Sequence, residues 1–304
     1  MSLPLHGMQK LLYYPVFGFF YLLSLLPFRV LYGLSNFAAF LLRDVFGYRK
    51  QVVADNLAHS FPDMPLAERE RIAHKFYVNF TDNWIETIKL LSISKKALNK
   101  RISGNMDVFF QLHAEGRSVQ FNLGHFFNWE ILNLYTCINQ PYTYLTVYLP
   151  QSNPIMDRLI VYVRSRWGNP QLPVTDMARA IIPWRNKQYL LALAADQSPA
   201  NPDQTWWLNF MGRPTPFPKG PEKFARSMNI PVVMMTTTRK KRGYYHMDFF
   251  LLADNPRALP EGELMRLYVR QIEKNIRLQP ELYLWSHKRW KHQWDEKYAS
   301  FWLD

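Results

Sequence analysis

His125 and Glu130 are residue types that could carry acid–base chemistry, and they stand five positions apart in the apolar and aromatic stretch FNLGHFFNWEILN (121–133). A histidine ring can take up a proton near neutral pH, and a carboxylate can hold that ring in one tautomer. On one continuous helix, two positions five apart point roughly 140° away from each other. The two side chains can therefore meet only if His125 lies on a loop after a strand and Glu130 in the first turn of a helix.

The residues around this pair favour such a change of backbone. The segment SVQFNL (118–123) is predicted to form a buried strand, and Gly124 to be a turn residue. Asn128 is a good N-cap for a helix that begins with WEILNLYTCI. The sequence thus predicts a strand, a turn and a helix, with the histidine and the glutamate on the two sides of the turn.

Other forms of catalysis find less support around His125. No serine or cysteine stands next to it in the strand-turn-helix position that a nucleophile elbow requires. The one cysteine of the sequence, Cys137, follows an apolar run, so we expect it in the core and not in a disulfide. His125 and Glu130 lack a third ligand at any recognised metal spacing. We therefore predict no metal and no cofactor.

The composition predicts a folded protein with an anionic partner. The chain has 304 residues, of which 48% are apolar and 16% aromatic, and its formal net charge is +13. That much apolar material is ample for a core. The positive charge calls for nucleic acid, anionic lipid or an acidic protein, and charge alone does not choose among them.

Residues 1–50 are predicted to form a hydrophobic segment that anchors the chain to a membrane. Residues 11–28 carry no charge, and a second apolar run continues to Leu42. The alternatives are one spanning helix, a helical hairpin, or helices in the interface. A cleaved secretory signal is disfavoured because no small-residue cleavage site follows. The cations Arg43, Arg49 and Lys50 come next, so the rest of the chain is expected on the cytoplasmic side.

Residues 51–304 are predicted to form one domain of the α/β class, with a layered, mainly parallel sheet flanked by helices. It divides into a helical preface (51–110), an α/β core (111–280) and a basic aromatic tail (281–304). In such sheets ligands bind at the carboxyl ends of strands, which is where Gly124-His125 and Asp196-Gln197 fall. The predicted strands are 118–123, 142–149, 188–195, 230–238 and 244–253, and the predicted helices are 128–138, 154–167, 175–184, 220–228 and 260–278.

Several motifs stand in an order that resembles a known family. They are YRKQVVADNLAHSFPDM, GHFFNWE, NPIMDRLIVYVRSRWG, DQSP, FMGRPTPFPKGPEKFARSMNIPVV and QPELYLWSHKRWK. This series is similar to that of the bacterial lipid A biosynthesis acyltransferases, the lauroyl and myristoyl transferase group of the wider glycerolipid acyltransferase superfamily. The likeness covers nearly everything after residue 40. One departure is Phe127, where the family usually has glycine, and this residue is expected to change the shape of the acceptor or acyl pocket.

The resemblance implies roles for individual residues. His125 would be the general base and Glu130 the carboxylate that orients it. Arg158 is expected to line the site, bound to a phosphate of the acceptor or to the oxyanion of the tetrahedral intermediate. For Arg164, a surface or ion-pair role is about equally expected. Asp196 would orient Arg158 or the donor, or else cap a turn.

Further positions are expected to border the substrates or the donor. Gly212 and Thr215 resemble the family's loop across the mouth of the site, and Asn128 is expected nearby. Lys219, Lys223 and Arg226 could receive an acidic acyl carrier protein or simply solvate a helix face. The run RKKRG (239–243) fits a charged hairpin tip better than a lipid contact, and the aromatic and cationic tail YLWSHKRWKHQW fits the headgroup zone of a membrane.

Taken together, the resemblance implies a membrane-bound O-acyltransferase of the bacterial inner membrane, with its catalytic domain on the cytoplasmic side. It would transfer a fatty acyl group from an acyl carrier protein or CoA thioester to a hydroxyl of a lipid A precursor, without an acyl-enzyme. The alternative is the same chemistry on a lysophospholipid or an amino-acid-headed lipid. The expected partners are the donor, the lipid acceptor and the anionic membrane surface, and not nucleic acid. A basic binding protein without turnover would leave the ordered motifs unexplained.

Overall fold

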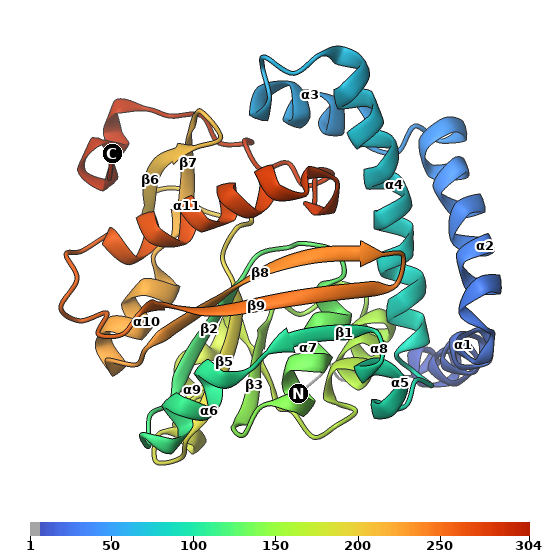
Figure 1. Cartoon of the computed structure of the whole chain (residues 1–304), viewed down its shortest axis with the longest axis horizontal. Coiled ribbons are helices and arrows are strands. Elements are labelled where there is room, and N and C mark those ends of the chain that lie inside the picture. Colours follow the sequence, from blue (N-terminus) through green and yellow to red (C-terminus); the bar gives the residue numbers. More distant parts are fainter. Residues whose placement is uncertain (1–6) are drawn as a thin grey trace.

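The computed structural model describes residues 7–304, and its centre is a seven-stranded sheet (Figure 1). The strand order is β1-β9-β8-β2-β5-β3-β4, and every neighbouring pair is parallel except β8 and β9. The predicted α/β class with a mainly parallel sheet is confirmed. The strands are β1 (Ile102–Asn105), β2 (Val119–Leu123), β3 (Thr143–Tyr148), β4 (Gln171–Pro173), β5 (Tyr189–Ala194), β8 (Val232–Lys241) and β9 (Tyr244–Ala253).

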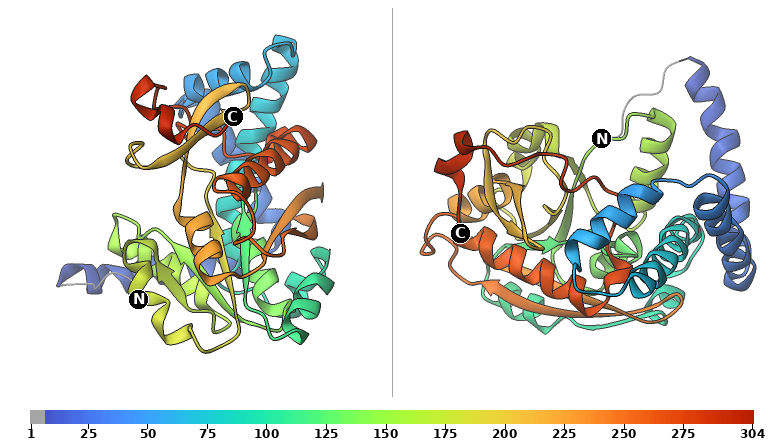
Figure 2. Two further views of the ribbon diagram at one scale, coloured as in Figure 1. Left: turned by 90° about the vertical axis from the view of Figure 1, so that its left-hand side faces the viewer. Right: turned by 90° about the horizontal axis from the view of Figure 1, so that it is seen from above.

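Helices cover both faces of the sheet because its central strands are apolar on both sides. In β2, Val119 and Phe121 point into the core shared with three helices, α6 (Asp107–Ala114), α7 (Trp129–Asn139) and α8 (Pro154–Ser165). On the opposite face, Met234 of β8 packs against α11 (Glu263–Leu278). A shorter helix, α10 (Gly220–Met228), packs on the same face. The result is a three-layer sandwich, seen from two further sides in Figure 2.

The N-terminal part of the chain forms two helices that pack beside the long helix α4 (Leu66–Lys89) (Figures 1 and 2). They are α1 (Met8–Leu25) and α2 (Phe28–Phe40), and a short π-helical turn, Leu41–Val45, extends the second. Pro27 restricts Leu26 to an extended backbone, which ends α1 there. The axes of the segments Met8–Leu25 and Phe28–Val45 are bent by 117° relative to each other.

None of the helices in residues 7–304 is individually long and apolar enough to cross a bilayer. The bent pair of α1 and α2 taken together has the length and the apolar composition of a membrane span. The division into an anchoring segment (1–50) and a catalytic domain (51–304) stays a prediction, and residues 1–6 of that segment lie outside the described residues. The helical preface also contains α3 (Lys50–Ser60) and α5 (Lys95–Asn99).

Two other predictions of local structure need correction. The helix expected over 175–184 is broken into a 3-10 turn (Val174–Asp176), the short helix α9 (Met177–Ala180) and a second 3-10 turn (Ile182–Trp184), because Pro183 cannot donate a backbone hydrogen bond. The loop expected around Gly212 is an antiparallel hairpin of β6 (Thr205–Phe210) and β7 (Arg213–Pro218). Its two turn residues, Met211 and Gly212, have φ of 52° and 81°, which suits a tight two-residue turn.

The tail does not form the aromatic strip at a membrane surface that its sequence predicts. The Trp285 side chain is fully buried, and its indole nitrogen donates to the carbonyl oxygen of Pro280 at 2.6 Å. The Arg289 side chain is also buried and donates to the carbonyl oxygen of Pro216. The first part of the tail is therefore core material, and its last turn is a 3-10 helix, Glu296–Phe301.

Two smaller predictions agree with the structure. Cys137 packs against the main core, where burial raises the pKa of its thiol to about 11. The run RKKRG lies at the turn between β8 and β9, as a charged hairpin tip should. Arg239 and Arg242 of this turn both pair with the buried carboxylate of Asp82, so the hairpin tip is docked on α4.

Candidate active site

The site lies where strands β2, β5 and β3 end side by side. Leu123 of β2 and Ala194 of β5 are direct neighbours in the sheet. His125 and Asp196 each follow two residues after the end of their strand, so the register brings them to the same place. Carboxyl ends of parallel strands are the usual position of ligand sites in such sheets.

The turn after β2 leaves little room for a side chain at position 124 because the chain passes close to helix α11. A Cβ atom at position 124 would lie 2.6 Å from the Cδ1 atom of Ile272. Four residues later, the Asn128 side chain accepts hydrogen bonds from the backbone N–H groups of Glu130 and Ile131 and so caps α7. The predicted strand, turn and capped helix are therefore confirmed.

The His125 ring is held by Asp196 and not by Glu130. Nδ1 of the ring lies 2.7 Å from Oδ1 of Asp196, and the backbone N–H of His125 donates to Oδ2 at 2.8 Å. Both carboxylate oxygens are thus engaged by one residue. The expected hydrogen bond from His125 to Glu130 is replaced by this one, because the sheet register sets Asp196 beside the ring.

The Asp196 carboxylate is held in its charged form although it is buried, with only 1% of the residue exposed. Burial raises the pKa of this carboxyl, but the charge of His125 and the hydrogen bonds from its ring and backbone outweigh burial and lower it. When the ring is neutral, the Asp196 carboxylate favours the tautomer with its proton on Nδ1, which leaves Nε2 to act as the base. Among residues 7–304, no hydrogen bond engages Nε2.

Tyr268 of α11 ties the ends of the two strands together. Its hydroxyl donates to the carbonyl oxygen of Leu123 at 2.8 Å and accepts from the backbone N–H of Ala195 at 3.1 Å. Sequence reasoning missed this residue, since nothing in the pattern of an amphipathic helix marks which tyrosine faces the strand ends.

The tail supports the loop that carries Asp196. The Nε2 atom of His287 accepts a hydrogen bond from the backbone N–H of Ser198 at 2.9 Å, and His292 contacts the carbonyl oxygen of Pro199. Burial, reinforced by the charge of Arg289, lowers the pKa of His287 to about 4. His287 is therefore neutral at neutral pH, as an acceptor of this bond must be.

Glu130 forms an ion pair with Arg164 on the opposite wall of the site. Nε of Arg164 lies 2.9 Å from Oε2 of Glu130, and Nη2 lies 2.5 Å from Oε1. The indole N–H of Trp129 also donates to Oε1 at 3.1 Å. This paired geometry is the strong, directional form of the arginine–carboxylate contact.

Arg158 was expected to line the site ahead of Arg164, and the structure shows the opposite. Arg164 lies in the site, whereas Arg158 lies on another face of α8 and contacts the ring of Tyr13 in α1. The two positions are six residues apart, about 120° round the helix, so they face different neighbours. Arg158 is consequently not oriented by Asp196.

Asn128 is fully buried and has no side-chain group left for a substrate. Besides capping α7, it donates from Nδ2 to Oε2 of Glu86 at 3.0 Å. Tyr32 of α2 and Tyr245 of β9 also donate to the Glu86 carboxylate. Burial and the charge of Asp82 raise the pKa of Glu86. The role of Asn128 in this structure is to position the start of α7.

The residues of the two walls enclose a cavity of about 380 Å³. His125, Glu130 and Arg164 are polar groups that line it, and the aromatic side chains of Trp84 and Trp129 form part of the remaining wall. Tyr148 and Leu149 reach it from the end of β3. Sequence reasoning overlooked these aromatic residues, although the end of the predicted strand 142–149 was a signal for Tyr148.

Other predicted site residues lie outside this cavity. Phe127 is buried and stacks near Phe76 and Trp129, so it supports the wall from behind. Gly212 is in the hairpin turn, and Thr215 is buried in β7 with its hydroxyl on the carbonyl oxygen of Arg213. None of the three lines the cavity within the part of the chain that the structure describes. For Gly212 and Thr215, the reason is that their segment forms an antiparallel hairpin and not a loop across the mouth of the site.

The basic stretch before and within α10 is also separate from the cavity. The Nζ atom of Lys219 lies 3.8 Å from the ring centres of both Trp206 and Phe301, and Arg226 donates to the carbonyl oxygen of Pro256. Lys223 is exposed. Reception of an acyl carrier protein on this stretch stays a prediction.

This arrangement can support acyl transfer without a covalent enzyme intermediate. A histidine with a fixed tautomer borders a cavity that also contains an arginine, so a base and a fixed cation face one volume. A base removes a proton from an attacking hydroxyl, and a cation stabilises the negative oxygen that forms on the attacked carbonyl.

Comparisons with known proteins identify the family to which the chain is similar. The family model described as bacterial lipid A biosynthesis acyltransferase matches residues 5–292. The chain is also 24% identical over 280 residues to the lipid A biosynthesis lauroyltransferase of Escherichia coli (strain K12), a match that covers 90% of this chain and 89% of that protein.

Proposed function

The chain belongs to the bacterial lipid A biosynthesis acyltransferase family, and on that premise we propose that it transfers a fatty acyl group from a carrier thioester to a hydroxyl of a lipid A precursor. One observation carries the mechanism. The His125 ring borders the cavity, and its Nδ1 atom is bonded to a buried aspartate while no described residue engages Nε2.

In this mechanism Nε2 of His125 takes the proton from the acceptor hydroxyl as its oxygen attacks the thioester carbonyl. A C–O bond forms, and the Asp196 carboxylate stabilises the imidazolium that develops. The C–S bond then breaks, and the proton passes from the ring to the departing thiolate. No group of the protein becomes acylated.

Arg164 is proposed to stabilise the oxyanion of the tetrahedral intermediate. Its Nε and Nη2 atoms are held by Glu130, and no hydrogen bond in residues 7–304 engages Nη1. A guanidinium that is fixed on one side presents its remaining N–H groups in a defined direction. Glu130 would then act through Arg164 and not through His125.

We also propose that the bent helix pair holds the protein at the cytoplasmic face of the bacterial inner membrane. The side chains of Leu11, Phe19 and Leu22 in α1 and of Phe37 in α2 are 62–75% exposed. Exposed apolar surface of this extent marks a membrane or protein contact, and the net charge of +13 suits an anionic bilayer.

The test is an assay of the purified full-length protein with fatty acyl carrier protein and fatty acyl-CoA thioesters of several chain lengths. The acceptors are a lipid A precursor, a lysophospholipid and an amino-acid-headed lipid, and the products are identified by mass spectrometry. We expect product with the lipid A precursor. Product with another acceptor alone would replace the proposed substrate and leave the chemistry intact.

The same assay tests the base. His125→Ala is expected to lower kcat by about 10²- to 10⁴-fold, the usual contribution of a general base. The matched control is His246→Ala, because His246 is also hydrogen-bonded to an aspartate, Asp248, but outside the cavity. An activity of His125→Ala within a few-fold of the His246→Ala activity would refute the mechanism.

A further inference from the structure

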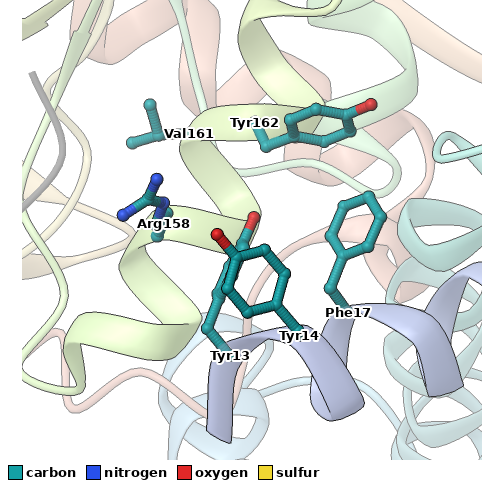
Figure 3. Close-up of a pocket in the computed structure, with 6 residues that line it drawn as sticks. All are labelled: Tyr13, Tyr14, Phe17, Arg158, Val161 and Tyr162. Atoms are coloured by element: carbon teal, nitrogen blue, oxygen red, sulfur yellow. The ribbon is translucent and has the colours of Figure 1, made fainter. Parts of the chain in front are cut away.

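A groove separate from the candidate active site lies between helices α1 and α8 (Figure 3). Its volume is about 530 Å³, within the range of small-molecule sites. Within the described part of the chain, the groove is lined by Tyr13, Tyr14, Phe17, Arg158, Val161 and Tyr162. The groove thus combines one cation with aromatic and aliphatic walls, which is the composition that an amphiphile with an anionic head would need.

Arg158 is the charged group among the described residues that line the groove, and it has no carboxylate partner among residues 7–304. Its guanidinium carbon lies 5.0 Å from the centre of the Tyr13 ring. The guanidinium also hydrogen-bonds to the Tyr13 hydroxyl, but it carries five N–H donors, so part of its N–H edge remains for another ligand. An anion with oxygen acceptors, such as a phosphate, matches that edge.

The apolar part of the groove is formed by rings from both helices. Phe17 of α1 and Tyr162 of α8 meet edge to face, with their ring centres 5.0 Å apart. Tyr14 is 71% exposed and Tyr162 is 43% exposed, so their surfaces are not used up by packing inside the protein. Figure 3 shows these rings on the two sides of the groove with Arg158 at one end.

The groove and the candidate active site lie on different faces of α8. Arg158, Val161 and Tyr162 line the groove, while Ile160 and Arg164 line the cavity that contains His125. Among residues 7–304, none lines both. A molecule bound in the groove is therefore separated from the reacting groups by the helix itself, which argues for a resident lipid and against the lipid that is being acylated.

We propose that the groove binds one anionic glycerophospholipid of the membrane, with its phosphate on Arg158 and an acyl chain along the rings of Tyr14, Phe17 and Tyr162. Two observations select an anionic lipid. The groove has a cation without a carboxylate, and α1, which forms one wall, also exposes large apolar side chains such as Leu11 and Phe19. This inference rests on the proposed contact of α1 with the membrane and not on acyl transfer.

The experiment is native mass spectrometry of the full-length protein in detergent, titrated with dioleoyl phosphatidylglycerol or with dioleoylglycerol, which has the same acyl chains and no phosphate. We expect one phosphatidylglycerol to bind about tenfold more tightly than dioleoylglycerol, as one charge-assisted contact to the phosphate would give. Arg158→Gln should remove that tenfold preference, and Arg158→Lys should restore part of it. Tyr14→Ala should weaken both lipids.

The matched control is Arg179→Gln, because the Arg179 side chain is 84% exposed on α9 and lines neither cavity. This variant should keep the preference for phosphatidylglycerol. Equal losses in the Arg158 and Arg179 variants would mean diffuse attraction to charge and would overturn the proposal. So would equal binding of both lipids, or displacement of phosphatidylglycerol by millimolar inorganic phosphate. His125→Ala should bind phosphatidylglycerol normally, so a failure of the acyl-transfer proposal is distinguishable from a failure of this one.

Discussion

Replacing Asp196 by asparagine is the change that tests the proposed hydrogen-bond arrangement most directly. The carboxylate accepts two hydrogen bonds from His125, from Nδ1–H at 2.7 Å and from the backbone N–H at 2.8 Å. Asparagine has nearly the same volume but only one acceptor oxygen, and its other arm is an N–H donor. The two donors of His125 cannot both be satisfied in the variant.

The consequence for catalysis follows from which arm faces the ring. If the asparagine oxygen stays on the backbone N–H, its amide donates to Nδ1, and the ring proton moves to Nε2. A protonated Nε2 cannot take the proton of the acceptor hydroxyl. We therefore expect kcat to fall by about 10²- to 10⁴-fold, equivalent to roughly 2.7–5.5 kcal/mol of barrier.

The assay is single-turnover transfer from a saturating acyl carrier thioester, with thermal unfolding measured on the same preparations. Asp248→Asn is the matched control, because Asp248 also contacts a histidine, His246, at 3.0 Å but is 62% exposed and far from the cavity lining. It should keep at least half of the activity. If Asp196→Asn kept the wild-type rate within fivefold and the wild-type melting temperature, the tautomer argument would be refuted.

Three further outcomes are expected. Glu130→Gln and Arg164→Gln should each lower activity. Because the two side chains act as one unit, the double variant should be no less active than the poorer single variant. Additive losses in a double-mutant cycle would contradict this. The free energy of unfolding should fall as the pH drops from about 6.5 to about 4, by about 3 kcal/mol in total, because unfolded His287 binds a proton near pH 6.5 but folded His287 only near pH 4. Denaturant titrations at several pH values measure this, and His287→Gln should flatten the profile; an unchanged slope would speak against the buried bond to Ser198. Phe127→Ala should cost about 3–5 kcal/mol of stability as a core cavity and leave acceptor preference unchanged, and a shifted acceptor preference in a stable variant would show that Phe127 shapes the pocket after all.

Local patterns in the sequence were sufficient for the elements around the site. A short apolar run before Gly124 predicted β2, and Asn128 before an apolar helix predicted the cap of α7. Both depend on neighbours within a few positions, where propensity and capping act. The lone histidine at that turn could be identified in the same way. The short strands β1 and β4 and the proline-rich strand β7 were missed, because their sequences carry too weak a pattern of strand-forming residues.

The partners of the charged residues could not be read from local patterns. Glu130 is closer to His125 in sequence than Asp196 is, and Arg158 comes before Arg164 on the same helix. Which carboxylate meets the ring depends on which strand lies beside β2. Which arginine meets Glu130 depends on the face that α8 turns toward α7.

The sequence by itself therefore determined the α/β class, the family motifs, and the strand-turn-helix that presents His125. Only the tertiary structure decided that Asp196 orients this histidine and that Glu130 pairs with Arg164. The physical reason is the parallel pairing of β2 with β5, in which Leu123 stands beside Ala194. That pairing joins residues about seventy positions apart through a crossover, so no short stretch of sequence contains both partners of the bond.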